Sequence, residues 1–245
     1  FSLSPGGLLL PWHMGVLSSL EEQGYLTSAT PLAGSSAGAI AVAAHAAGVS
    51  PWDTVEATIR LNGALCGGAV DNTGGGGVAA RGRLLPLLRT ELEDMLPENV
   101  HELYNEREGT VGIAYREVFP VPKNVLRTAY DSKDDCIEAV CNSSMFPFFS
   151  TDWPCVVRAP GDDLPYVPRL VVDGFFAVPR ERFGCPVLPN VDRTVLVSVF
   201  PGAVSDETIE AADRIEPPPN ADPATFVRRA TRTSSRKECG VMYEE

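Results

Sequence analysis

The chain of 245 residues is poor in the side chains that build metal and redox sites. Only three histidines are present, and none of the six cysteines forms a Cys-x-x-Cys pair. Zinc sites need such clusters, so we predict no metal and no cofactor. The cysteines also lack the regular spacing of a disulfide framework, and we interpret them as reduced thiols of an intracellular protein.

Positive charge and long apolar runs are also lacking. The formal net charge is −12, which argues against a nucleic-acid partner because phosphate contacts need clustered lysine and arginine. The longest apolar stretches, such as residues 37–49, are shorter than the roughly 20 residues of a membrane-spanning helix, so no transmembrane segment is predicted. Lipid contact would therefore be mainly apolar, with local help from one basic run. This run comprises Arg228, Arg229, Arg232, Arg236 and Lys237.

What is present is the pattern of an α/β domain. With 44% hydrophobic residues the chain can form a sizeable core. Apolar spacing predicts helices over residues 11–23, 39–47, 51–61, 84–96 and 134–144. Strands are predicted over residues 1–4, 30–33, 111–119, 125–130, 169–172 and 194–200. Strands that alternate with helices through the first half imply a mostly parallel sheet covered by helices on both faces.

Two segments depart from this pattern. Residues 66–82 are rich in glycine, and we expect a mobile loop there. After Ser205 the composition becomes polar and rich in proline. We therefore place the main domain at residues 1–205 and expect residues 206–245 to pack peripherally or to be partly disordered.

The segment Gly34-Ser35-Ser36-Ala37-Gly38 stands between a predicted strand and an alanine-rich helix. A serine at such a turn is held in a strained conformation that exposes its hydroxyl, and Gly34 and Gly38 remove side chains that would collide across the turn. The first turn of the helix also brings a positive dipole end close to a developing alkoxide. Ser36 is therefore a candidate nucleophile, although the same pattern also occurs in ordinary tight turns.

A second glycine turn, Pro5-Gly6-Gly7-Leu8, joins the first predicted strand to the first helix. Acyl transfer needs fixed N–H donors that face the oxyanion of the tetrahedral intermediate, and a glycine turn entering a helix supplies them. A phosphate-binding loop is the alternative reading, but neither of its two common glycine patterns is present.

The three histidines are poorly placed to act as a base for Ser36. His45 follows Ser36 by nine residues on the same predicted helix, which carries it about 13 Å away at ~1.5 Å per residue. His13 is expected in the helix after the glycine turn, and His101 in a polar segment. A Ser-His-Asp hydrolase of the α/β type would instead place its histidine late in the chain, after the acid.

A carboxylate is the remaining candidate for the base. Asp173 ends the predicted strand over residues 169–172 and is followed by Gly174, which permits close approach. Burial at a strand end would raise the pKa of Asp173 and make it a better proton acceptor. The same dipeptide is also common in simple Asp-Gly turns, and the local sequence leaves both interpretations open.

These elements, in this order, resemble the patatin-like phospholipase family. Residues 4–17 look like the family's glycine-rich turn and first helix, and residues 32–40 match its nucleophile elbow. Residues 135–149, with their Ser-Ser-x-x-Pro segment, are similar to the helix and turn before the family's aspartate motif. The likeness extends over about residues 1–202, where the last strand looks like that of the animal triglyceride-lipase branch.

The resemblance implies a three-layer α/β/α fold and a serine lipid acyl hydrolase that needs no metal. Ser36 and Asp173 would form its catalytic dyad, and the backbone amides of Gly6, Gly7 and Leu8 its oxyanion hole. The substrate would be a phospholipid, a galactolipid or an acylglycerol, met at a membrane or lipid-droplet surface. An acyltransferase or transacylase on the same dyad, and a catalytically weak lipid-binding protein, are the alternatives.

Some residues depart from the family pattern. Phe175 stands where the aspartate motif usually has glycine or alanine, and Pro5 and Leu10 stand where glycine is common. Phe175 could crowd the base, and Pro5 removes one backbone donor. Apolar residues that could line an acyl channel, although most such residues simply pack in a core, are Trp12, Phe146, Phe148, Phe149, Phe175 and Phe176.

The start of the chain bears on its expected location. It begins at Phe1 without an initiator methionine, so we expect an excised domain or a processed product that has lost any targeting segment. The expected location is intracellular, in the cytoplasm or at a membrane or lipid droplet, with a plastid as a further option. The oligomeric state is not predicted.

Overall fold

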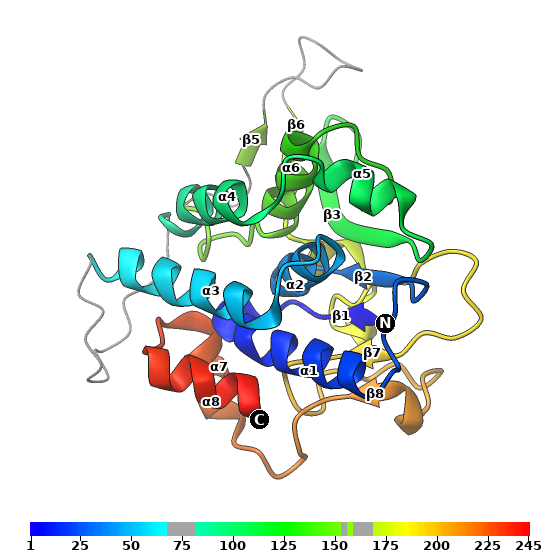
Figure 1. Cartoon of the computed structure of the whole chain (residues 1–245), viewed down its shortest axis with the longest axis vertical. Helices are drawn as coiled ribbons and strands as arrows, with labels where there is room; N and C mark the ends of the chain where they lie inside the picture. Colours follow the sequence, from blue (N-terminus) through cyan, green and yellow to red (C-terminus); the bar gives the residue numbers. More distant parts are fainter. Residues whose placement is uncertain (68–81, 153–155, 159–168) are drawn as a thin grey trace.

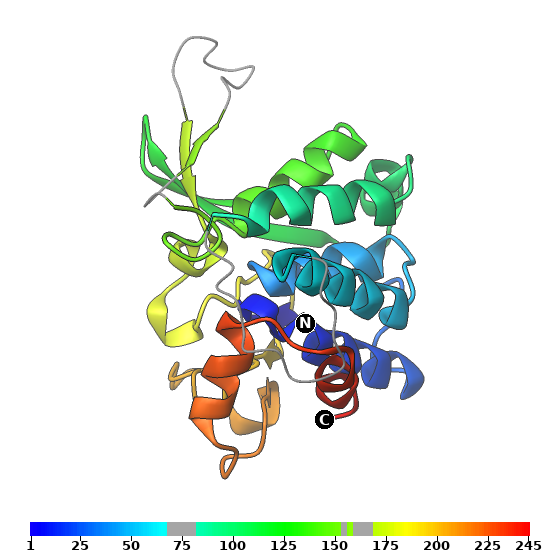
Figure 2. The same cartoon turned by 90° about the vertical axis from the view of Figure 1, so that its left-hand side faces the viewer.

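A computed structural model of the chain describes residues 1–67, 82–152, 156–158 and 169–245. Its sheet is mixed and mostly parallel, with the strand order β5-β6-β3-β2-β1-β7-β8 and with β4 beside β3. Together with eight α-helices among the described residues, this sheet is consistent with the predicted three-layer α/β/α fold (Figures 1 and 2). The glycine-rich loop predicted over residues 66–82 lies mostly outside the described residues.

The strands fall into a parallel and an antiparallel group. The parallel strands are β1 (Ser2–Leu3), β2 (Leu32–Gly34), β3 (Val111–Phe119), β7 (Leu196–Val197) and β8 (Arg214–Ile215). The antiparallel additions are β4 (Lys123–Arg127), β5 (Val156–Arg158) and β6 (Arg169–Val172). The strand predicted over residues 194–200 is therefore shorter than expected, and β5 and β8 were not predicted.

The α-helices follow the predicted apolar spacing in the first part of the chain. They are α1 (Leu10–Glu22), α2 (Ala37–Ala46), α3 (Pro51–Leu65), α4 (Leu84–Met95), α5 (Val100–Glu106), α6 (Lys133–Ser143), α7 (Pro223–Thr231) and α8 (Arg236–Glu244). A 3-10 turn, η1 (Gly7–Leu9), precedes α1, and another, η2 (Gly174–Ala177), follows β6. Helices α5, α7 and α8 were not predicted.

Helix α2 lies at the centre of the molecule, where it packs against β1, β2 and β3 and against α1, α3 and α6 (Figure 1). Its side chains are mostly alanine, and Ala39, Ala41, Ala43 and Ala44 are fully buried. Small side chains let the neighbouring backbones come close. A Cβ atom on Gly38, in the first turn of α2, would lie 2.5 Å from the carbonyl oxygen of Leu3 in β1.

The last helices pack against the first ones. Helix α8 lies against α1 and α3, and a Cβ atom on Gly15 of α1 would lie 2.1 Å from the carbonyl oxygen of Tyr243 in α8. Helix α7 lies against η1, and Figure 2 shows both C-terminal helices on the side of the molecule that holds the start of the chain. The division of the chain at residue 205 stays a prediction.

Two further observations concern the chain as a whole. No helix among the described residues combines the length and the apolar character needed to cross a bilayer. Five cysteines lie in the described residues, and all five are free thiols.

Candidate active site

Ser36 lies at the sharp turn between β2 and α2. Its backbone has φ 54° and ψ −121°, a conformation that is strained for a residue with a side chain. The turn is tight because a Cβ atom on Gly34 would lie 2.3 Å from the carbonyl oxygen of Gly38. The strand, turn and helix therefore have the geometry that the sequence predicts for a nucleophile elbow.

The order of the strands brings Asp173 to the same place. Strand β2 runs parallel to β3 and ends with Gly34 opposite Ile113, whereas β6 runs antiparallel to β3 and ends with Val172 opposite Arg116. The two strand ends therefore approach each other along β3. Gly174 lies at the junction, where an added Cβ atom would be 2.3 Å from the Ala114 carbonyl oxygen and 2.7 Å from the side chain of Ser35.

One short segment at the end of α6, residues 143–145, binds both strand ends. The N–H group of Ser36 donates a hydrogen bond to Ser143 Oγ at 2.8 Å, and this hydroxyl donates in turn to the Ala114 carbonyl oxygen at 2.6 Å. The N–H group of Asp173 donates to the carbonyl oxygen of Met145 at 2.9 Å. The sequence analysis assigned no role to Ser143, and its only signal there was the Ser-Ser-x-x-Pro segment.

Asp173 is fully buried, and burial raises its pKa to about 7 from the ordinary value of 3.8. Hydrogen bonds from the Phe175 N–H group and from the Ser36 hydroxyl act in the opposite direction and lower the pKa. The Phe175 N–H group donates to Oδ1 at 2.8 Å, whereas Oδ2 has no well-aligned hydrogen bond among the described residues. Bonds of this kind are often long or misaligned until a substrate binds. Oδ2 is thus the carboxylate oxygen still able to accept a proton.

Buried polar groups bind Ser4, the residue directly before the Pro5–Leu8 turn, and so hold the turn in place. His13 Nε2 lies 2.8 Å from the Ser4 carbonyl oxygen, and the Val199 N–H group donates to Ser4 Oγ. Burial lowers the pKa of His13 to about 4, so the ring is neutral near pH 7 and Nε2 must carry the proton that it donates. His13 therefore supports the turn.

The turn itself is shaped by Gly7, whose φ of +56° is left-handed. An added Cβ atom would lie 2.3 Å from the Ala230 carbonyl oxygen at the end of α7. The backbone amides of Gly6, Gly7 and Leu8 have no acceptor among the described residues. Gly7 also borders both cavities that Ser36 borders.

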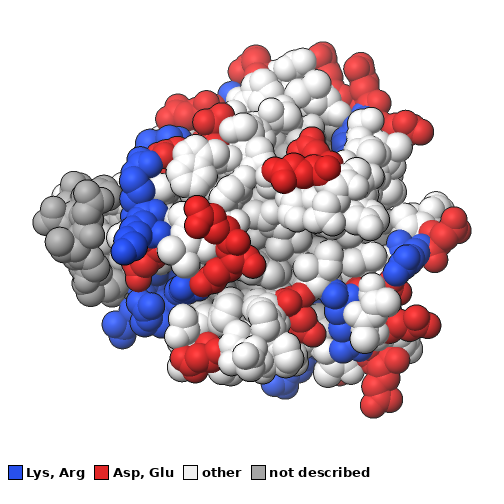
Figure 3. Space-filling view, turned by 60° about the horizontal axis from the view of Figure 1, so that its bottom comes forward, with Lys and Arg blue, Asp and Glu red and all other residues white. Residues whose placement is uncertain are grey.

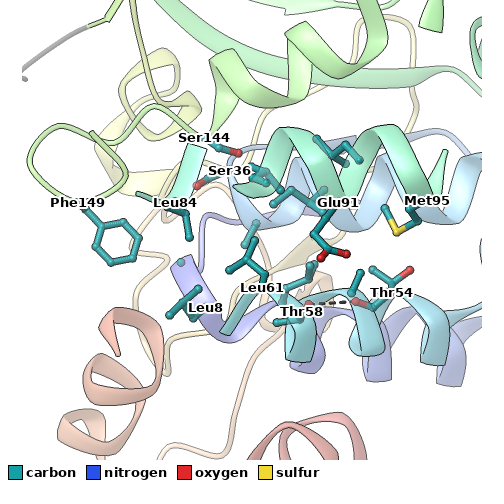
Figure 4. Close-up of a pocket in the computed structure, with 17 residues that line it drawn as sticks. Leu8, Ser36, Thr54, Thr58, Leu61, Leu84, Glu91, Met95, Ser144 and Phe149 are labelled. Carbon is teal, nitrogen blue, oxygen red and sulfur yellow. Dashed lines mark hydrogen bonds between the residues drawn. The ribbon is translucent and has the colours of Figure 1, made fainter. Parts of the chain in front are cut away.

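The first of these cavities, the α3–α4 slot, is a narrow space of about 50 Å³ that extends from Ser36 between α3 and α4 (Figure 4). Six of its wall residues are leucines, namely Leu8, Leu10, Leu61, Leu84, Leu88 and Leu92, and the polar wall residues include Thr54, Thr58 and Ser144. Glu91 is the one charged residue among its described walls, and Arg60 of α3 binds its carboxylate at 2.8 Å.

The second cavity, the phenylalanine vestibule, has a volume of about 280 Å³ and lies on the other side of Ser36. Its aromatic walls are Phe146, Phe149, Phe175, Phe183 and Phe200. Pro5, Ala230 and Thr231 complete it, and no charged residue is among its described walls. No histidine borders either cavity among the described residues.

The predicted acyl-channel residues thus divide into two groups. Phe146, Phe149 and Phe175 border the vestibule. The other three, Trp12, Phe148 and Phe176, are absent from the described walls of both cavities. Trp12 is buried against His13, and Phe148 is 57% exposed. Sequence reasoning missed Phe183, Phe200 and the whole slot, because their residues are distant in the chain.

Comparison with known families agrees with this geometry. The sequence model of the family described as patatin-like phospholipase matches residues 1–181. The chain belongs to this family. A search of curated proteins gave no significant match. Patatin-like phospholipases are generally lipid hydrolases, which supports an enzyme that acts on lipid acyl groups.

Two departures from the patatin-like pattern, Pro5 and Phe175, lie next to the same glycine, Gly184. A Cβ atom on Gly184 would lie 2.6 Å from the Pro5 ring and 3.1 Å from the Phe175 Cα atom, so both departures meet at this glycine. The Phe175 ring lies in the vestibule wall, in contact with Phe146 and Phe183, and its amide holds the Asp173 carboxylate. The third departure, Leu10, borders the slot.

The basic run near the end of this patatin-like chain is largely neutralised. Arg228 pairs with Glu238 and Arg229 with Glu245, and Arg236 pairs with Glu56 of α3. Figure 3 shows many lysine and arginine side chains along one edge of the face, and others among the acidic side chains that are spread over the rest. Strong electrostatic attraction of this face to an anionic surface is therefore not expected.

Proposed function

We propose that the protein hydrolyses fatty acyl esters of lipids through a Ser36–Asp173 dyad. The strongest support comes from two energetically unfavourable features at one place. Ser36 has a strained backbone with φ 54°, and Asp173 is a fully buried carboxyl group whose pKa is about 7. Neither feature stabilises the fold, and such groups concentrate at functional sites. Ser36 borders two apolar cavities that suit acyl chains.

In the acylation step, Ser36 Oγ attacks the ester carbonyl carbon and forms a C–O bond, while Asp173 Oδ2 takes the hydroxyl proton. The carbonyl electron pair moves to oxygen. When the tetrahedral intermediate collapses, the bond to the alcohol oxygen breaks and that oxygen takes the proton from Asp173. The products are an acyl-enzyme on Ser36 and a free alcohol.

In the deacylation step, a water molecule attacks the acyl-enzyme and gives a proton to Asp173. Collapse of the second intermediate releases the fatty acid, and Ser36 Oγ regains the proton. A base with a pKa of about 7 accepts and returns a proton readily near neutral pH, whereas an ordinary aspartate would be too weak a base.

The amides of Gly6, Gly7 and Leu8 are the proposed oxyanion donors. They lack other acceptors among the described residues, and η1 starts there, so the helix end adds a positive field. The Ser36 amide is not available, because it is bonded to Ser143 Oγ.

The test combines active-site labelling with a lipid assay. A fluorophosphonate probe should label the wild type and leave Ser36→Ala unlabelled. Release of fatty acid from a panel of acylglycerols, phospholipids and galactolipids should fall by at least about 10³-fold in Ser36→Ala and in Asp173→Asn. His45→Gln is the matched control and should keep wild-type activity.

Other outcomes lead to different conclusions. Full activity in Asp173→Asn would show that Asp173 is not the catalytic base. A Ser36 that does not react with the probe would favour a lipid-binding protein without catalysis. Transfer of the acyl group to an added acceptor lipid in preference to water would assign the same dyad to an acyltransferase.

A further inference from the structure

The peptide unit between Pro5 and Gly6 carries the first proposed oxyanion donor, the Gly6 N–H group. Gly6 lies in the vestibule wall together with Ser36. The C=O and N–H bonds of a trans peptide point in opposite directions. This peptide is trans, because the one cis peptide bond among the described residues lies elsewhere. Whatever binds the Pro5 carbonyl oxygen therefore sets the direction of the Gly6 N–H group.

The side chain of Ser4 binds that carbonyl oxygen. Ser4 Oγ lies 2.9 Å from the Pro5 carbonyl oxygen and 3.2 Å from the Val199 nitrogen. The Val199 N–H group can only donate, so Ser4 Oγ accepts from it and gives its own single proton to the Pro5 carbonyl oxygen. The directions of both hydrogen bonds are thereby fixed, and the Gly6 N–H group points away from Ser4.

Ser4 is held in place independently of its hydroxyl. It is fully buried, its N–H group donates to the Val197 carbonyl oxygen at 2.9 Å, and its own carbonyl oxygen lies 2.8 Å from His13 Nε2. Removal of the hydroxyl alone leaves these backbone bonds intact. Ser4 is absent from the described walls of both cavities, so its side chain does not touch a substrate there.

Val199 contacts the turn a second time through its side chain. A Cβ atom on Gly6 would lie 3.1 Å from Val199 Cγ2 and 3.5 Å from the Cβ atom of Ala37, the residue that follows Ser36. Gly6 therefore packs close to both residues. Val199 lies outside residues 1–181, so the part of the chain beyond the family match supplies one anchor of the turn.

The next peptide unit of the turn is oriented in another way. The Leu9 N–H group donates to the Gly6 carbonyl oxygen at 3.0 Å, which directs the Gly7 N–H group away from Leu9. This bond joins main-chain groups of η1 and needs no particular side chain. The bond from Ser4 Oγ depends on a side chain, and a substitution can remove it.

We propose that Ser4 is a positioning residue for the oxyanion hole. Its hydroxyl, bound by the Val199 amide, orients the Gly6 N–H group toward the carbonyl oxygen of a substrate at Ser36. Negative charge develops on that oxygen only in the transition state, so a well-oriented donor raises kcat with little effect on KM. This inference rests on the proposed hydrolysis at Ser36 and goes beyond it by naming a residue that acts through the turn.

The first experiment compares Ser4→Ala with Ser2→Ala on p-nitrophenyl butyrate. Ser2 lies on the same strand, is also buried, and donates its hydroxyl proton to the Pro186 carbonyl oxygen, so it is a matched control. Thermal unfolding should show similar losses of stability in both variants. Ser4→Ala should have a kcat at least about tenfold below that of Ser2→Ala, with KM within about twofold.

The pH profile separates the oxyanion hole from the base. The midpoint of kcat/KM should stay at about pH 7 in Ser4→Ala, because the surroundings of Asp173 are unchanged. A shifted midpoint in Ser4→Ala would show that the substitution acts through the base and would overturn the proposed role.

A trifluoromethyl ketone tests the oxyanion hole directly. Ser36 Oγ adds to its carbonyl carbon, the hydroxyl proton goes to Asp173, and the carbonyl electron pair becomes the oxyanion of a hemiketal that resembles the tetrahedral intermediate. The inhibition constant should rise in Ser4→Ala by the factor by which kcat/KM falls. In a wild-type crystal with this adduct, the Gly6 nitrogen should lie about 2.7–3.1 Å from the hemiketal oxygen. The crystal tests the inference even where Ser4→Ala does not fold.

The possible failures are distinguishable. Equal losses of kcat in Ser4→Ala and Ser2→Ala, unchanged inhibition of Ser4→Ala by the ketone, or an adduct whose oxygen does not face Gly6 would overturn the role of Ser4 and leave the proposed hydrolase standing. If the wild type does not cleave the small ester, or if Ser36→Ala still cleaves it, the proposed function fails, and the inference fails with it.

Discussion

Residues 1–181, which the family model matches, and residues 182–245, which it does not, are joined to the candidate site in different ways. The first region carries Ser36 and Asp173 and holds the Ser36 turn through buried hydrogen bonds such as those of Ser143. The second region has three ion pairs at its surface around α7 and α8. It also supplies β7 and β8 of the sheet, buried core residues such as Val199 and Met242, and part of the vestibule wall: Phe183, Phe200 and the end of α7.

The two regions therefore differ in which part of the candidate site they supply: the dyad residues or part of the cavity wall. Ser36, Asp173 and Ser143 lie within the matched region, so they share its constraints. Part of the vestibule wall, formed by Phe183, Phe200, Ala230 and Thr231, lies outside it. Substrate preference can therefore change through residues 182–245 while the reacting groups stay the same.

The strongest expected effect concerns the folding stability that is lost when the buried Asp173 ionises. Its pKa of about 7 lies above the unfolded value of 3.8, so the unfolded chain ionises first as the pH rises. Stability is lost between about pH 4 and pH 7 and stays low above that. Asp173→Asn keeps an oxygen for the Phe175 amide and removes this cost. We expect it to be more stable than the wild type by up to about 4 kcal/mol near pH 8 and equally stable near pH 4.

Urea unfolding at the two pH values measures this difference, and equal stabilities at both would contradict the raised pKa.

The same group sets the pH dependence of the wild-type enzyme. Its kcat/KM should fall about tenfold per pH unit below about pH 7, because Asp173 is then protonated and cannot act as a base.

The contact between the two regions at Gly7 should give the next largest effect. Gly7→Ala places a Cβ atom 2.3 Å from the Ala230 carbonyl oxygen, so η1 or α7 must move. We expect kcat to fall about 10²-fold, since displaced donors no longer meet the oxyanion. Gly24→Ala is the matched control. Gly24 also has a positive φ, of +76°, but open space around it, and the variant should be slightly less stable and fully active.

Ser143→Ala tests the support of Ser36 inside the first region. The variant leaves the Ser36 amide and the Ala114 carbonyl without their shared partner, and we expect kcat to fall about tenfold with little change in KM. Ser198→Ala removes another buried hydroxyl, bonded to the Phe200 carbonyl, and is the control. Equal losses in both variants would show a general packing effect and would exclude a positioning role.

The smallest effect is expected for the ion pairs of the second region. Arg236→Ala removes an exposed pair with Glu56, and neither the melting temperature nor the activity should change measurably. Met242→Ala on the same helix empties a buried position and should cost about 2–5 kcal/mol. A large effect of Arg236→Ala would mean that surface charge holds α8 in place.

Much of the fold could be predicted from local sequence patterns. The alternation of Val111–Phe119, the alanine run of α2 and the strand before Asp173 are regular over enough residues to define an element. Ser50, a residue type that commonly caps helices, stands directly before α3, and its side chain accepts a hydrogen bond from the Asp53 amide. These features depend only on neighbours in the chain.

The parts that were missed depend on distant contacts. Helix α7 has nine residues and only two buried ones, Phe226 and Ala230, and it follows a polar, proline-rich segment, so it was assigned to a peripheral or disordered tail. Ser143 meets Ser36 from 107 residues away, and the slot joins side chains from several helices. Residue spacing alone does not reveal contacts between residues that are distant in the sequence.

The attachment of Ser36 and Asp173 to Ser143 and Met145 has a consequence for evolution. Because only two peptide units separate the two points of attachment, a shift of the outer helices is expected to move Ser36 and Asp173 together. Lineages can therefore exchange whole surface elements, or acquire new ones, without readjusting the reacting pair at each step.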